Sequence, residues 1–336
     1  MIVRILTLLM SIGLWASALE QQDAPYPMTL SEYGFFQGDI ADLIPASGVI
    51  PYDVNAPLFS DYAQKSRMIR LPEGTTIVYK GRGILDLPEG TELIKTFYYF
   101  KEESKPDKGR FILETRVLKK GKEGWTALPY IWNEEQTEAY LEVAGGNRQI
   151  KWKNTQGKKQ SLNYQVPNMV QCKSCHAQGK DLVPIGLSAR QLNHSGQLSS
   201  WAAMGILIDK PEKQLIPQLA DWNDEKSGTL ADRARAYLDS NCGHCHNPEG
   251  PANTSGMYLD IYTDDPAQWG VNKAPIAAGK GAGGRMYGIV PGSPNASILV
   301  YRMESTNPGE MMPELGRQMV HQEGLDLIKA WIREME

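Results

Sequence analysis

The stretch from Thr229 to His246, TLADRARAYLDSNCGHCH, joins a helical pattern to a cysteine motif without a break. Thr229, followed three residues later by Asp232, is typical of a helix N-terminus. The apolar residues after it recur at helical spacing, at Leu230, Ala234, Tyr237 and Leu238. The pattern therefore predicts a helix that carries Cys242 at its C-terminal end.

The C-x-x-C-H pattern that ends this stretch occurs twice, and the two copies use all four cysteines of the 336 residues. They are Cys172-Lys173-Ser174-Cys175-His176 and Cys242-Gly243-His244-Cys245-His246. At the cysteine and histidine frequencies of this chain, one copy arises by chance in fewer than about one chain in a thousand. The motifs therefore indicate a shared chemistry.

That chemistry follows from helix geometry, because residues i and i+3 face the same side of a turn and i+4 lies beside them. Two thiols so placed add to the two vinyl groups of one haem, and the adjacent imidazole binds the iron. We therefore expect two covalently attached haem c groups. The expected cofactor-binding residues are Cys172, Cys175, His176, Cys242, Cys245 and His246, with His176 and His246 as iron ligands.

Other uses of the cysteines stay open as alternatives. Two disulfides suit an exported chain, but the paired spacing argues against them. A zinc site needs four ligands where the two motifs offer six, and a thiol redox pair leaves the trailing histidine without a role.

A sixth iron ligand for the second haem is predicted in the segment MMPELG, 311–316, shortly before the last predicted helix. A thioether at this position favours reduced iron and raises its potential. Met312 is the predicted ligand, Met311 is its main competitor, and Met286 and His321 follow. For the first haem the candidates are Met169, His194, Met204, a residue of the N-terminal domain, or an open position.

The N-terminal half has short apolar runs separated by polar, glycine-containing turns. The predicted strands are 93–100, 111–118, 125–132 and 148–153, and their spacing favours an antiparallel sandwich. One group there is also typical of a carbohydrate or acid/base site, although strand aromatics usually lie in a core. It comprises Trp125, Tyr130, Trp132, Asn133, Glu134, Glu135 and Glu138.

Together these patterns predict an α+β multidomain chain, with a β-sandwich-like domain followed by a mainly α-helical, cytochrome c-like haem region. Helices at 229–241 and 322–336 are expected to bracket a loop-rich segment. The predicted parts are a signal peptide (1–18), an N-terminal extension (19–51), a β-rich domain (52–165), a first haem-binding segment (166–222) and a cytochrome c-like domain with the second haem (223–336).

The signal peptide is predicted from a basic start at Arg4, an apolar run over 5–16 and small residues at 16–18. The run is too short to span a bilayer, so Sec-type export to a periplasm and cleavage after Ala18 are expected, with a retained anchor helix as the alternative. No membrane span is expected in the mature chain. The net charge of −4 argues against a nucleic-acid partner.

The chain resembles a family of exported dihaem c-type cytochromes along most of its length. The resemblance lies in 233–246, in Gly292-Ser293-Pro294 and in Met312-Pro313-Glu314-Leu315-Gly316. It implies a β-rich region before two haem sites, with iron bound by the motif histidines and by Met312.

We expect an electron carrier between a periplasmic dehydrogenase and a respiratory acceptor, rather than a stand-alone catalyst. The alternatives are a dihaem peroxidase-like enzyme with an open first haem, and a haem-containing module that binds a carbohydrate or a partner.

Overall fold

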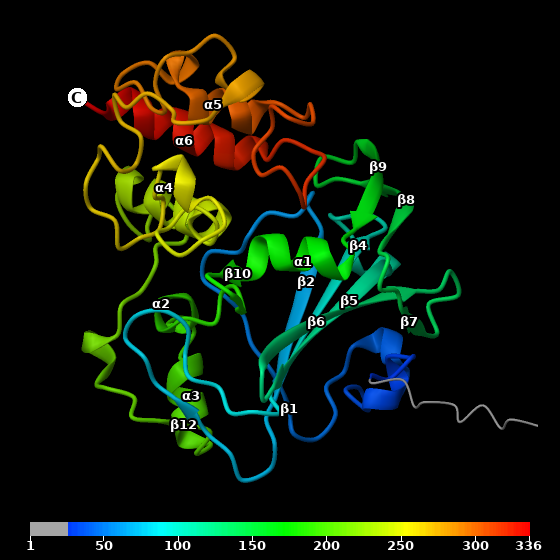
Figure 1. Ribbon diagram of the computed structural model, residues 1–336. Helices are drawn as coiled ribbons and strands as arrows, with labels where there is room; N and C mark the ends of the chain where they lie inside the picture. The colour runs from blue at the N-terminus through cyan, green and yellow to red at the C-terminus, as the bar shows by residue number, and fades with distance from the viewer. Residues whose placement is uncertain (1–25) are drawn as a thin grey trace, which may run out of the picture.

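A six-stranded antiparallel sheet forms the framework of the computed structural model, which describes residues 26–336 (Figure 1). The predicted signal peptide, residues 1–18, lies outside the described residues. The strand order is β1-β2-β4-β5-β6-β7. In chain order the strands are β1 (Val49–Pro51), β2 (Gln64–Arg70), β4 (Glu92–Phe100), β5 (Arg110–Gly121), β6 (Gly124–Trp132) and β7 (Ala139–Leu141).

Shorter elements complete the fold. The remaining strands pair as a hairpin of β8 (Gly146–Lys153) with β9 (Lys159–Val166), β3 (Ile77–Val78) with β12 (Leu207–Ile208), and β10 (Ala177–Gln178) with β11 (Asp181–Leu182). The helices are α1 (Met169–His176), α2 (Ala189–Leu192), α3 (Gln197–Ala203), α4 (Leu230–Leu238), α5 (Ile298–Glu304) and α6 (Gln322–Glu334). No helix within residues 26–336 is both long and apolar enough to cross a membrane.

One face of the sheet has an apolar row at its centre, because side chains alternate between the faces of a strand. Met68, Ile94, Val117 and Leu128 are direct cross-strand neighbours on this face. The N-terminal segment packs over them through residues such as Leu30 and Phe35, which are almost fully buried. This layer is one hydrophobic core.

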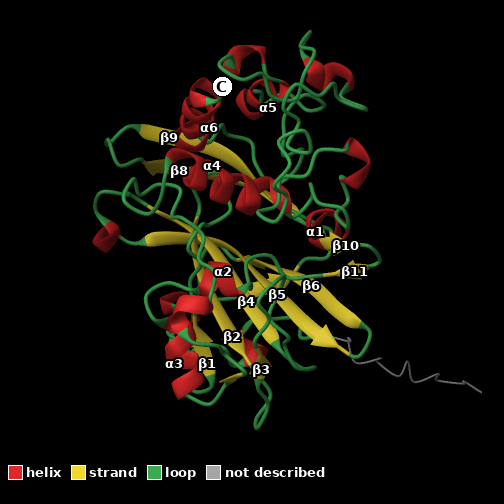
Figure 2. Ribbon diagram, turned by 90° about the vertical axis from the view of Figure 1, so that its left-hand side faces the viewer, coloured by secondary structure: helices red, strands yellow, loops and turns green. Residues whose placement is uncertain are grey.

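The opposite face is covered in sections. At one end, Ile69, Leu93, Leu118 and Ala127 form a cross-strand row that packs with residues of α2 and α3, among them Trp201. At the other end, Phe97 and Tyr99 pack against Trp152 and Tyr164 of the hairpin. Figure 2 shows α2 and α3 beside the sheet, with β8 and β9 nearer α4 and α6. The middle of this face borders the cysteine motifs.

The predicted fold class, a sandwich-like domain followed by a mainly α-helical region, is wrong. The strands predicted at 93–100, 111–118, 125–132 and 148–153 are present, but they form one large sheet and a hairpin instead of two facing sheets. A period-2 pattern shows that a strand has a buried face, and does not show whether a sheet, a helix or a loop buries it.

The C-terminal region is also not mainly α-helical. The predicted helices at 229–241 and 322–336 appear as α4 and α6, and α4 begins with the expected capping box of Thr229 and Asp232. Between α4 and α5, however, residues 244–297 form turns, loops and short 3-10 segments. The many glycines and prolines of this segment favour turns over continuous helix.

Helices α4 and α6 pack directly on each other. Tyr237 and Leu238 of α4 share a core with Leu325 and Ile328 of α6. Gly324 makes this approach possible, because a Cβ atom there would lie 2.3 Å from the ring of Tyr237. In Figure 1 these helices lie at one end of the molecule and the sheet at the other, with α1 between them.

Polar contacts join the segments that carry the two motifs. Arg190 of α2 forms an ion pair with Asp239, with Nη2 3.1 Å from Oδ1, and both side chains are largely buried. Gln191 donates to the Ser240 hydroxyl at 2.8 Å, and the amide of Phe59 donates to Asn241 Oδ1 at 2.7 Å. The chain before Cys242 is therefore held against α2 and the loop before β2.

Replacing Trp132 with alanine is expected to cost about 3–5 kcal/mol of stability, because the side chain is 1 % exposed and its removal leaves a cavity. The indole Nε1 also donates to Thr115 Oγ1 at 3.0 Å, and that hydroxyl would lose its donor. Urea unfolding measures the loss. Val143→Ala, at a side chain 55 % exposed, is the control and is expected to change stability by less than about 0.5 kcal/mol. Equal urea midpoints for Trp132→Ala and Val143→Ala would show that Trp132 does not stabilise the core.

Candidate functional site

The first motif lies on α1 and ends with it. Asn168 caps the helix by accepting from the Gln171 amide at 2.8 Å, while Gln171 Oε1 accepts from the Asn168 amide at 3.0 Å. The helix thus begins just before Cys172 and ends at His176. Cys172, Cys175 and His176 all line one cleft, as the spacing predicted.

The second motif continues from α4 through a π-helical turn, Asp239–Gly243, which carries Cys242. The amide of His246 donates to the Cys242 carbonyl at 2.8 Å and closes one more turn. Gly243 allows the next segment to approach, because a Cβ atom there would lie 2.9 Å from the Asp260 backbone. The motif is therefore a compact helical end packed against the loop at 260.

Both motif histidines have the same hydrogen-bonding arrangement. Nδ1 of His176 lies 2.7 Å from the Val183 carbonyl, and Nδ1 of His246 lies 3.2 Å from the Met257 carbonyl. A carbonyl oxygen only accepts, so Nδ1 of His176 carries the proton and its Nε2 keeps the lone pair. Nδ1 of His246 also lies 3.2 Å from the Ser255 hydroxyl, which can donate or accept. Burial lowers the pKa of His176 to about 3 and also lowers the pKa of His246. Both imidazoles are thus neutral and oriented, as a metal ligand requires.

A largely apolar cavity adjoins the second motif. Cys242, His246 and Met312 all line it, and it encloses about 690 Å³ of empty space, part of which is open to solvent. Much of its wall is apolar, including Met257, Leu259, Ile298 and Leu299. The predicted sixth ligand, Met312, therefore lies on the same cavity as His246, 66 residues away in the sequence.

The competitors of Met312 lie elsewhere. Met311 is buried but is not among the residues that line this cavity, and Met286 is 69 % exposed. His321 stacks on Phe59, with ring centroids 4.2 Å apart, and its Nδ1 lies 3.0 Å from the Tyr237 hydroxyl. His321 lines the cleft next to the first motif, which Cys242 and Met312 also line, and it does not line the cavity of His246.

Arg317 holds the Met312 loop in place. Its side chain is buried, and it donates to the carbonyls of Arg302 at 3.0 Å, Ser305 at 2.8 Å and Met312 at 3.0 Å. Burial lowers the pKa of this guanidinium. The three backbone carbonyls replace the water molecules that would solvate the guanidinium at the surface. The loop is therefore wrapped around the Arg317 side chain.

The cleft at the first motif is larger and more polar. It encloses about 1310 Å³ of empty space, partly open to solvent, and includes Cys172, Cys175 and His176. A neighbouring cleft of about 1450 Å³ shares Cys175 and His244 with it. The wall opposite the motif is the central part of the sheet, from which Lys95 and Arg116 point into the cleft.

None of the three predicted sixth ligands of the first haem lines this cleft. Met169 packs with the core on the far face of the sheet, and Met204 is 53 % exposed. His194 contacts the Ser195 hydroxyl at 3.2 Å. The sequence reasoning missed Met303 and His244, which do line it. Neither residue has a local signal that separates it from an ordinary core or motif residue.

The aromatic and acidic group predicted as a possible carbohydrate site is divided between environments. Tyr130 and Trp132 are almost fully buried and belong to the core under the N-terminal segment, so they are not available for stacking on a sugar. Trp125 packs on the core of α2 and α3. Glu138 accepts from the Ser31 hydroxyl at 2.5 Å, and the Glu134 side chain is 89 % exposed.

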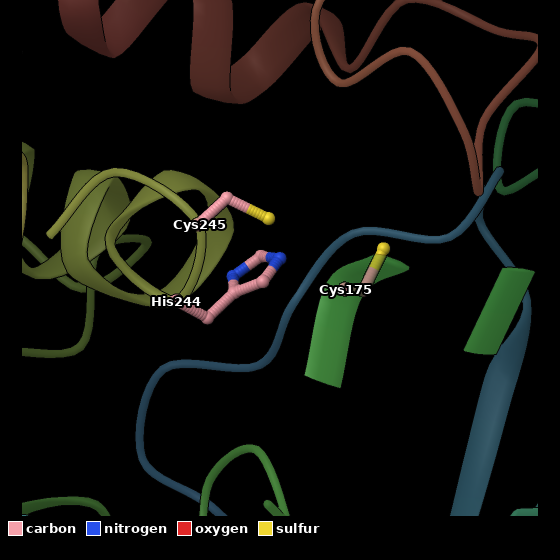
Figure 3. Close-up of side chains that lie close together, drawn as sticks. All are labelled: Cys175, His244 and Cys245. Atoms are coloured by element: carbon pink, nitrogen blue, oxygen red, sulfur yellow. The ribbon is translucent and has the colours of Figure 1, made fainter. Parts of the chain in front are cut away.

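The two motifs meet at Cys175, His244 and Cys245. Ligand atoms of these three residues lie within 4.8 Å of one another, and Figure 3 shows Cys175 of α1 facing the other two. A hydrogen bond between the thiols lowers the pKa of Cys175 and raises that of Cys245, because one thiolate is stabilised by the other thiol. All four cysteines are free thiols. Two thiols and an imidazole are also soft metal ligands.

No family model, curated protein or solved structure matches this chain. The functional argument therefore depends on the residues and on their geometry.

Arg317→Met is expected to loosen the Met312 loop, because several hydrogen bonds from a charged donor to carbonyls are lost. The amide of Met312, which donates to the Arg302 carbonyl at 3.0 Å, is expected to exchange with solvent at least about tenfold faster. Hydrogen exchange of the segment 305–319 measures this. Arg333→Met, at an exposed position of α6, is the control, and equal exchange in both variants would show that Arg317 does not hold the loop.

Proposed function

We propose that this chain is an exported dihaem c-type cytochrome that carries single electrons between a periplasmic dehydrogenase and a respiratory acceptor. One observation carries the proposal: Cys242, His246 and Met312 line one apolar cavity, although the methionine is remote in sequence. A thioether bond, a proximal imidazole and a distal thioether are what a c-type electron-transfer haem requires.

The cavity beside Cys242 and His246 suits a haem, while Cys245 lies off this cavity and faces Cys175. The cavity wall is rich in aliphatic side chains, which suit a large apolar ring. The orientation of His246 by the Met257 carbonyl leaves Nε2 available for iron, and Arg317 holds the loop of Met312. These residues would position both axial ligands and exclude water from the ring.

The first motif fits a haem by its cysteines, its proximal histidine and the volume of its cleft. His176 is oriented by the Val183 carbonyl in the same way as His246 is by Met257. Cys175 and Cys245 lie close together, so in this proposal the two haems would be attached at neighbouring points. Such proximity favours electron exchange between the two sites within one chain.

The cofactor, when bound, supplies the one-electron redox couple. The chain binds it, orders the axial side chains and shields it from solvent. Export is part of the proposal because covalent haem and the pattern at 1–18 both suit a periplasmic protein, and the resemblance to exported dihaem cytochromes agrees with this.

Mature protein is expected to contain two haems per chain by pyridine haemochrome assay. Each double variant, Cys172→Ala/Cys175→Ala or Cys242→Ala/Cys245→Ala, is expected to keep one haem, because each motif attaches its own cofactor. The two variants control for each other. Matured protein without haem, or a double variant that keeps both haems, would refute the proposal.

Met312→Ala is expected to lower the potential of one haem by on the order of 100 mV, because a thioether ligand favours reduced iron. The other haem is expected to keep its potential. A spectroelectrochemical titration resolves the two. Met311→Ala is the matched control, since Met311 is the adjacent methionine and does not line the cavity. A larger shift in Met311→Ala than in Met312→Ala would reverse the assignment.

A second candidate function is metal binding at Cys175, His244 and Cys245, favoured by their mutual approach within 4.8 Å. It requires free thiolates, so it excludes haem attachment at the same cysteines. Intact mass distinguishes the two functions, because one adds two haem groups and the other adds a zinc or copper ion that a chelator removes.

A further inference from the structure

Three basic side chains form one row across the sheet. Arg67 of β2 is the direct partner of Lys95 of β4, and Lys95 is the direct partner of Arg116 of β5. Direct partners in neighbouring strands lie on the same face of a sheet. We call Arg67, Lys95 and Arg116 the cation row.

The cation row faces the clefts at the first motif. Lys95 lines both clefts, Arg116 lines one and Arg67 the other. Cys175 also lines both, and His176 lines the cleft of Arg116. The next row on the same face, which includes Leu93 and Leu118, is apolar and buried, so the change to three cations occurs where the sheet borders the motif.

Like charges placed directly opposite one another destabilise a sheet, so the row needs compensation. Arg67 has Asp53 at 2.7 Å, and Arg116 has Glu114 at 2.5 Å. Glu114 is completely buried and also accepts from the Tyr164 hydroxyl at 2.6 Å. The charges at both ends of the row are therefore paired.

The ammonium group of Lys95, in the middle, has no hydrogen bond or ion pair with any side chain or carbonyl in 26–336. This group lies 5.1 Å from the centroid of the Phe97 ring, a weak cation–π contact. Burial, with the charges of Arg67, Lys65 and Arg116, lowers its pKa well below the ordinary value. A partly buried cation without a partner is costly, so the site is suited to an anion.

We infer that the cation row binds carboxylate, and that the carboxylates are the propionates of the haem attached at the first motif. The inference rests on the proposed function. Haem carries two propionate groups, and the row shares its clefts with Cys175 and His176. Two guanidinium groups flank the lysine and cannot act as iron ligands, which favours anion binding over iron ligation by the row.

The test combines Lys95→Met with the variant Cys172→Ala/Cys175→Ala, which lacks the first haem. In holoprotein, Lys95→Met is expected to lower the melting temperature by about 2–5 °C, because the propionates lose a counter-ion. In the variant without the first haem, the same change is expected to leave the melting temperature unchanged or raise it, because a partly buried unpaired charge is removed. The same decrease in both backgrounds would overturn the inference.

Redox and spectral measurements give an independent readout. Lys95→Met is expected to lower the potential of one haem, because a nearby positive charge favours reduced iron, and to leave the absorption spectrum of both haems unchanged. Lys151→Met, on the exposed side of β8, is the control and is expected to shift neither potential. A change in iron coordination in Lys95→Met would instead identify Lys95 as an iron ligand and overturn the inference.

A soluble anion, rather than the haem propionates, is the other ligand that the cation row could bind. Calorimetric titration of the holoprotein with inorganic phosphate and with succinate is expected to give no binding, since the row is occupied. Binding that Lys95→Met abolishes would show that the row takes a soluble anion rather than the propionates. The haemochrome assay separates failure of the proposed function, which gives no haem, from failure of this inference, which gives two haems and none of the expected shifts.

Discussion

The ion pair between Arg190 and Asp239 determines how the two cysteine motifs lie relative to each other. Asp239 begins the turn that carries Cys242, and Arg190 belongs to the short helix that follows the first motif. Both side chains are largely buried. Separating them would leave a buried charge without its partner, which is costly, so the two segments are held together. The Tyr262 hydroxyl, which accepts from Arg190 at 2.5 Å, adds a third segment to the same junction.

The same packing gives the sheet a double role. One face packs under the N-terminal segment through a hydrophobic core, with the ion pair of Arg70 and Glu92 on the same face. The other begins as an apolar layer, changes to the cation row beside the first motif, and becomes apolar again under the hairpin. A protein that needed only stability would gain from continuing the apolar layer. Our proposal of a haem in this cleft would account for the charged middle section.

Local patterns were sufficient for β4, β5, β6 and β8 and for α4 and α6, but β2 and β9 were not predicted. The capping of α4 by Thr229, for example, involves residues three positions apart. The architecture was not predictable in this way. The pattern of Arg110–Gly121 shows a strand with two faces, and nothing in it states that one face meets a hairpin and the motifs. The loop-rich segment between α4 and α5 has no helical period, so the helical content of the C-terminal region was overestimated.

The sequence by itself determined the two motifs, because the positions of Cys172, Cys175 and His176 depend only on one turn of helix. The tertiary structure decided which residues meet across long separations. Met312 reaches the cavity of His246 through the loop held by Arg317, and Cys175 reaches Cys245 through the packing of α1 near α4. The cation row depends on strand register. These contacts depend on the burial of whole surfaces, which a spacing of a few residues does not encode.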